Sequence, residues 1–172
     1  MRRPPLVVVF VAVLVLALGE SAGAFLSLFR PPTQRYALGR IAANASAHGL
    51  TGAAEYDDEI RARTLFAAEA GVSFLHTHAE GVPTVVLVAA TLVATLVPRR
   101  RARAVLYALL AAGAFFPLGW LVYALAVLER GREAGIELAE TWVLAPLGSA
   151  VVLALLGLLL ALATGRGRER RA

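Results

Sequence analysis

Two of the three histidines in this 172-residue chain lie two positions apart, at His76 and His78, and Glu80 follows them. Imidazole and carboxylate groups together suit Zn²⁺, Mn²⁺ or non-haem iron. A single histidine can also ligate the iron of haem b, which needs no cysteine. The chain contains no cysteine, which excludes disulfides, thiolate metal sites and covalently attached haem. This segment is therefore a candidate site for a divalent metal or haem.

The spacing of these residues predicts which of them can act together. If residues 65–82 form one helix, Glu69, His76 and Glu80 fall within about 40° of one another around its axis. His78 then points to nearly the opposite side. We therefore expect a stripe of Glu69, His76 and Glu80 along one face. We do not expect His76 and His78 to bind one ion from a regular helix.

Glu20 is the one charged residue in the apolar run 6–29. In a membrane-spanning helix it would lie about 21 Å from Leu6 along the axis, at 1.5 Å per residue. That position is roughly 9 Å below the outer face of a hydrocarbon core ~30 Å thick. A carboxyl group at this depth is costly unless it is protonated, paired or facing a polar cavity. Glu20 is therefore a further candidate site residue.

The third histidine, His48, lies at the end of a helix predicted over residues 33–48, directly before Gly49. It shares one face of that helix with Arg40 and Asn44, at steps of four residues. His48 is another possible ligand. A histidine in the last turn of a helix also interacts favourably with the helix dipole, which is a purely structural role.

The candidate metal or haem ligands share ionisable side chains near one predicted membrane boundary: His76, His78, Glu80, Glu69, Glu20 and His48. The simpler alternative is that they are solvated or hydrogen-bonded polar residues at that boundary. The sequence lacks P-loop, dinucleotide-binding, H-E-x-x-H and G-x-S-x-G motifs, and it has no lysine for a Schiff base. No enzyme class is indicated, and the question of catalysis stays open.

The composition indicates the elements that must position these residues. Hydrophobic residues make up 59% of the chain and the mean hydropathy is +0.70, which is not typical of a soluble domain. We predict an all-α membrane protein, a single domain over residues 1–172 with an external helical segment between its first two spans. The predicted transmembrane helices are about 6–29, 78–97, 104–128 and 142–164, and the external helical loop is 30–77.

Counting about 20 residues back from Val97, the length that a membrane span needs, places His78 and Glu80 at the membrane boundary. Pro117, near the middle of the third span, is predicted to kink that helix. Residues 129–140 are predicted to form a short charged loop before the fourth span.

The first apolar run has an alternative interpretation as a cleaved signal peptide. Arg2 and Arg3 would be its positive region, 6–18 its apolar region and 22–24 its cleavage site. The apolar run continues to Phe29, which favours a membrane span instead.

All 17 basic side chains are arginine, and their distribution predicts the orientation in the membrane. The side with both termini and the turn at 98–103 carries ten arginines and one acidic residue. The side with residues 30–80 and 129–140 carries seven arginines and ten acidic residues. The positive-inside rule therefore places both termini in the cytoplasm of a multi-pass protein of the plasma (inner) membrane. The net charge of +5 follows from this topology, and we expect no nucleic-acid partner.

These observations favour a small prokaryotic membrane protein with a His/Glu site at the outer face, which binds haem or a metal ion in a redox role. One alternative is a non-catalytic assembly subunit, or a homo-oligomer, that uses its arginines and the small residues of the fourth span. Those residues are Ala145, Ser149, Ala150, Ala154 and Gly157. A third hypothesis is a component of a proton-coupled transporter that uses Glu20 and the histidines.

Overall fold

The computed structural model describes residues 3–169, with side chains for residues 3–164, and in this range the chain forms helices and no strand. The helices, in order, are α1 (Leu6–Ala43), α2 (Ala54–Leu96), α3 (Arg100–Gly113), α4 (Phe116–Arg130), α5 (Arg132–Ala139), the π-helical turn η1 (Glu140–Leu144) and α6 (Ala145–Glu169). The prediction of an all-helical chain is confirmed. Four segments are long and apolar enough to cross a membrane: α1, α2, α3 with α4, and α5 with α6.

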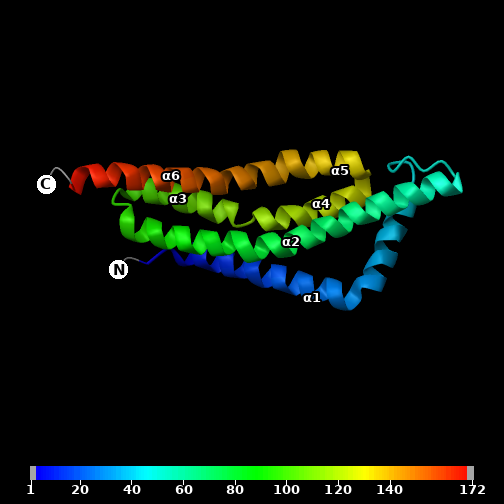
Figure 1. Ribbon diagram of the computed structural model, residues 1–172, viewed down its shortest axis with the longest axis horizontal. Coiled ribbons are helices and arrows are strands. Elements are labelled where there is room, and N and C mark those ends of the chain that lie inside the picture. The colour runs from blue at the N-terminus through cyan, green and yellow to red at the C-terminus, as the bar shows by residue number, and fades with distance from the viewer. Residues whose placement is uncertain (1–2, 170–172) are drawn as a thin grey trace.

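These four long segments lie side by side in an elongated bundle and run alternately in opposite directions along its length (Figure 1). The start of α1 and the end of α6 lie at the same end of the bundle, together with the α2–α3 turn. We call this the arginine end, because Arg3 and the arginines of residues 99–103 belong to it. The opposite end carries the α1–α2 turn, residues 44–53, and Gly131, and we call it the hairpin end.

The predicted external segment is continuous with the first two apolar helices. Helix α1 bends at Phe29, which has φ −118° and ψ 25°, and then continues to Ala43. The following residues, Pro31 and Pro32, cannot donate backbone hydrogen bonds, which accounts for the bend. Helix α2 runs unbroken through Pro83. The helix expected to end at His48 ends five residues earlier, and residues 44–49 form hydrogen-bonded turns.

Two expectations for the second half need correction. The segment 104–128 was expected to be one kinked helix, but it is two helices: α3 ends at Gly113 and α4 begins at Phe116. Pro117 lies in the first turn of α4, where backbone N–H groups have no partner within the helix, so the N–H that proline lacks is not missed. A charged loop was expected at 129–140, but these residues are mostly helical: Gly131 alone separates the end of α4 from the start of α5. Gly131 has φ +84°, and a Cβ atom there would lie 2.3 Å from the carbonyl oxygen of Ala47, so only glycine fits this tight connection.

The core is narrow, and much apolar surface faces outward. Its buried residues come from α1, α2, α3 and α6 and include Val8, Val15, Val86 and Leu110. Only 22% to 39% of the most apolar window of each long segment is buried within the chain. A water-soluble bundle would hide such surface, whereas a lipid environment accommodates it.

The small residues of the fourth span pack partly within the chain itself. Ala150 and Ala154 are buried. A Cβ atom on Gly157 would lie 2.8 Å from a methyl group of Leu106 on α3. This part of the face therefore serves the α3–α6 contact.

Candidate metal centre

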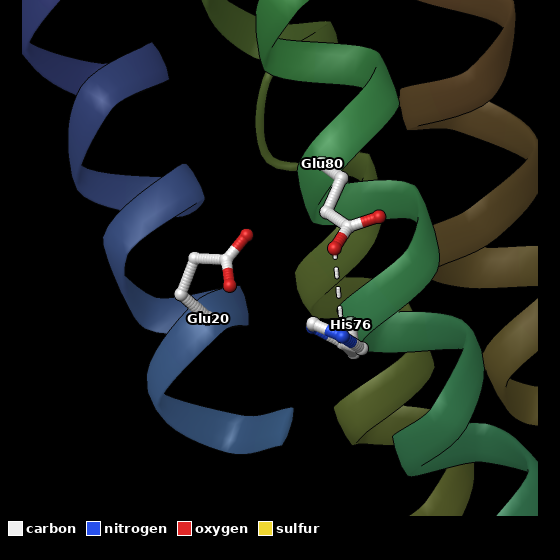
Figure 2. Close-up of side chains that lie close together, drawn as sticks. All are labelled: Glu20, His76 and Glu80. Carbon is white, nitrogen blue, oxygen red and sulfur yellow. Dashed lines mark ion pairs between the residues drawn. The ribbon is translucent and has the colours of Figure 1, made fainter. Parts of the chain in front are cut away.

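Three of the predicted site residues converge between α1 and α2. Glu20 extends from α1 toward His76 and Glu80, which lie one turn apart on α2 (Figure 2). One ligand atom from each residue lies within 4.8 Å of the other two. The Nε2 atom of His76 is 3.5 Å from a carboxylate oxygen of Glu80. An imidazole and two carboxylates at this spacing could bind one small cation together.

Two glycines one turn apart on α1 allow this approach. Gly19 is buried, and a Cβ atom added to it would lie 2.0 Å from the Cβ of Ala79. A Cβ atom added to Gly23 would lie 2.8 Å from the ring of His76. The spacing Gly19-x-x-x-Gly23 is the small-residue pattern that lets two apolar helices pack closely. This motif is visible in the sequence and marks the interface, although our sequence reasoning passed over it.

A backbone carbonyl orients the imidazole of His76. The Nδ1 atom lies 3.2 Å from the carbonyl oxygen of Gly19. If Nδ1–H donates to that oxygen, the Nε2 atom of a neutral ring presents its lone pair toward the carboxylate of Glu80. Histidines that bind metals commonly have one ring nitrogen fixed in this way. A lone pair and a carboxylate repel each other unless a proton or a cation lies between them.

The cluster borders an open depression of about 440 Å³ on the surface of the bundle. Its lining residues come from α1 and α2: Glu20, Gly23, Ala24, Leu26, Ser27, Ser73 and His76. The opening leaves room for water or a small ligand beside Glu20 and His76. An ion held by three protein ligands usually completes its coordination in this way.

Glu69 lies on the same helix but does not join the cluster. Its carboxylate accepts a hydrogen bond of 2.7 Å from Nε2 of Gln34 and lies 3.6 Å from a guanidinium nitrogen of Arg30. It is also about 10 Å from His76 along the helix, at 1.5 Å per residue. The bend at Phe29 is followed directly by the α1 segment that carries Arg30 and Gln34. Of the predicted stripe, His76 and Glu80 therefore belong to the cluster, and Glu69 belongs to an ion pair with Arg30.

His78 lies apart from His76, as the helical spacing predicts. Its ring packs against Phe116 and Trp120, with centroids 5.4 Å and 5.5 Å apart, and against Phe74 at 6.0 Å. Its Nδ1 atom is 2.8 Å from the carbonyl oxygen of Phe74. His78 therefore belongs to an aromatic cluster between α2 and α4.

His48 is buried at the hairpin end, where it joins the α1–α2 turn to α4. Its Nε2 atom is 3.0 Å from the carbonyl oxygen of Leu128. Arg40 forms an ion pair with Glu129, and Asn44 donates a hydrogen bond of 3.1 Å to the same carboxylate. The hydrogen bond from Arg40 is the main reason that the pKa of Glu129 lies below its usual value. We call Arg40, Asn44, His48 and Glu129 the hairpin lock.

Comparison of the chain with family models, with curated proteins and with solved structures finds no match.

Proposed function

We propose that this chain is a multi-pass membrane protein that binds a divalent transition-metal cation through Glu20, His76 and Glu80. The observation that carries the proposal is the convergence of these three donor groups within 4.8 Å. Zn²⁺, Mn²⁺ and Fe²⁺ all accept imidazole and carboxylate ligands. Two carboxylates would balance the charge of a divalent cation.

The membrane placement is part of this proposal. Most residues in the most apolar part of each of the four segments are not buried within the chain, as is expected of helices surrounded by lipid. The excess of arginine at one end favours a cytoplasmic arginine end and an external hairpin end, in a plasma (inner) membrane. The metal centre would then lie near the outer boundary of the bilayer.

The exposure of Glu20 strengthens the case for a bound cation. Its side chain is exposed, within the apolar part of α1, and forms no ion pair with arginine among the described residues. An unpaired carboxylate is costly inside a bilayer. A metal ion shared with Glu80 and His76 would remove this cost. Protonation of Glu20 is the alternative that a proton-coupled function requires.

The donor set suits a metal ion better than haem b. Two of the three donors are carboxylates, whereas a haem iron takes ligands such as histidine, methionine or cysteine. Gly19 also packs directly on Ala79 beside the cluster, which closes the space between α1 and α2 there. A redox role would require iron or manganese, because zinc does not change oxidation state. The identity of the bound metal therefore decides whether the centre is redox-active.

Metal retention by the purified protein tests this proposal. The protein in detergent is incubated separately with Zn²⁺, Mn²⁺ and Fe²⁺, freed of unbound metal and analysed for metal content. We expect close to one ion per chain for the wild type. His76→Gln and Glu80→Gln should each lower the metal affinity by at least about tenfold. Loss of a group that only hydrogen-bonds to a ligand already lowers metal affinity about 10–100-fold, and loss of the ligand itself should cost more.

The same helix provides matched controls. His78→Gln and Glu69→Gln remove the same chemical groups outside the cluster, and both variants should retain the ion. Equal retention by His76→Gln and His78→Gln would overturn the assignment. Absence of any retained metal in the wild type would do so as well.

A further inference from the structure

A second depression lies at the arginine end, far from the metal centre along the bundle. It measures about 420 Å³ and is lined by Arg3, Pro5, Ala94, Arg103 and Tyr107. These residues come from the start of the chain, the last turns of α2 and the first turns of α3. The fold thus brings two guanidinium groups and a phenol together from separate segments.

The positive charge of this depression is not balanced by nearby acids. Arg3 and Arg103 form no ion pair among the described residues. Every acidic residue whose side chain the structure describes lies within residues 20–80 or 129–140. Three exposed arginines, at positions 99–101, lie between α2, which contributes Ala94 to the lining, and Arg103 in the sequence.

The side chain of Arg103 is held in place. It is half-buried, and its Nη1 atom donates a hydrogen bond of 3.3 Å to the carbonyl oxygen of Val97. This leaves other N–H groups of the guanidinium free to bind a ligand. Arginine matches phosphate oxygens with paired hydrogen bonds. The hydroxyl of Tyr107 adds another donor in the same wall.

We propose that this depression binds the phosphodiester head group of an anionic phospholipid. The apolar surface beside it favours a lipid over free phosphate. Leu6 and Phe10 on the first turns of α1 are 84% and 66% exposed, and acyl chains could lie along them. Anionic lipids are enriched at cytoplasmic membrane surfaces, and basic pockets between helices bind their head groups. The inference uses the membrane placement proposed above but does not depend on the metal.

Thermal unfolding with added lipid tests this inference. The purified protein in a mild detergent is titrated with dioleoylphosphatidylglycerol, with dioleoylphosphatidylcholine and with inorganic phosphate. At a lipid concentration about 100 times the dissociation constant, we expect phosphatidylglycerol to raise the unfolding midpoint by about 5–10 °C. Phosphatidylcholine and inorganic phosphate should give no comparable shift.

Variants show whether the shift comes from this depression. Arg103→Gln should lose most of the phosphatidylglycerol shift, and Arg3→Gln and Tyr107→Phe should each lose part of it. Arg101→Gln is the matched control, because it removes the same charge from an exposed position outside the lining, and it should keep the full shift. If Arg103→Gln fails to fold, Arg3→Gln and Tyr107→Phe carry the test. His76→Gln should also keep the shift, which separates this inference from the metal proposal.

Three results would overturn the inference. Equal losses in Arg101→Gln and in Arg3→Gln or Arg103→Gln would mean general attraction to anionic lipid without a defined site. An equal shift with phosphatidylcholine would mean that the negative charge of the lipid is irrelevant. An equal shift with inorganic phosphate would assign the depression to a free anion.

Discussion

The hairpin lock and the candidate metal centre, which is the cluster of Glu20, His76 and Glu80, both contain a histidine and glutamate. The two clusters differ in how the glutamate is paired. In the hairpin lock, Glu129 receives hydrogen bonds from both Arg40 and Asn44. In the candidate metal centre, the imidazole of His76 lies 3.5 Å from the carboxylate of Glu80, and a carboxylate oxygen of Glu20 lies within 4.8 Å of both. The first cluster contains its own cation and needs none from outside. The second combines two carboxyl groups and one imidazole without an arginine, beside an open depression, which is an arrangement that a cation would complete.

The histidines of the two clusters, His48 and His76, differ in burial and in access to solvent. His48 is buried, with 8% of its surface exposed, and it holds the α1–α2 turn against the end of α4. His76 is half-buried, borders the depression and is oriented by the carbonyl of Gly19. Histidine and glutamate together are therefore weak evidence for a ligand site. The balance of charge and the access to solvent separate the two cases.

The largest effect is expected from separating α1 and α2 at the metal centre. In Gly19→Val the new side chain would collide with Ala79, and overpacking of this kind costs about 1–3 kcal/mol. The unfolding midpoint should fall and metal retention should be lost. Gly39→Val is the matched control on the same helix, because a Cβ atom at Gly39 has no neighbour within 4 Å, and it should keep its metal. Similar metal loss in both variants would break the link between close packing and the centre.

A smaller change should reduce metal binding with little effect on the fold. In Gly23→Ala the added methyl group would lie 2.8 Å from the ring of His76 and force the imidazole to move. We expect metal affinity to fall by about 10–100-fold, as when a ligand loses its orienting contacts. Gly81→Ala on α2 places its methyl group in open space and should bind metal normally. Titration calorimetry of the two variants makes the comparison, and equal affinities would show that the orientation of His76 does not matter.

Acid should destabilise the hairpin lock through Glu129, independently of the metal centre. Because Arg40 and Asn44 lower the pKa of Glu129, its stabilising contribution is complete above the pKa of the unfolded chain, near its usual value of 4.5. That contribution is lost as the pH falls below this value toward the lower pKa of the folded state. The protection factors of the amides in residues 44–53, which are corrected for the pH dependence of intrinsic exchange, should therefore decrease on acidification in the wild type. In Glu129→Gln these protection factors should already be low at neutral pH and should change less with acid.

Glu80→Gln is the control for the hairpin prediction, since it removes a carboxylate from the other cluster. It should leave exchange at residues 44–53 unchanged while it impairs metal binding. If Glu80→Gln and Glu129→Gln accelerate exchange equally, the two clusters are not independent, and the contrast between them fails.

The sequence predicted the helical class, which is confirmed, and the relative positions of His76, His78 and Glu80 on α2. Helical spacing separated His76 from His78 and placed Glu80 beside His76, because α2 is one regular helix. The depth in the membrane that is predicted for Glu20 made it a candidate. The contacts of Glu69 with Arg30 and Gln34, which keep it out of the cluster, could not be predicted, because they depend on how far α1 bends at Phe29. The role of His48 depends on α4, which is 80 residues away from it along the chain.

The signal that the sequence reasoning missed is Gly19-x-x-x-Gly23. It marks the face of α1 that packs on α2, and Glu20 lies next to Gly19 on that helix. Reading this motif together with the histidine spacing would have selected Glu20, His76 and Glu80 from the six candidates. The break at Ala114 and Phe115 was also missed, since a proline within an apolar run fits either a kinked helix or a new helix start.

X-ray absorption spectroscopy of the Zn²⁺-loaded protein tests the central claim most directly. We expect one imidazole nitrogen together with carboxylate or water oxygens, at about 2.0–2.2 Å from the metal. The imidazole signal should disappear in His76→Gln and persist in His78→Gln. A shell made only of oxygen atoms in the wild type, or an imidazole signal that survives His76→Gln, would contradict a metal centre at Glu20, His76 and Glu80.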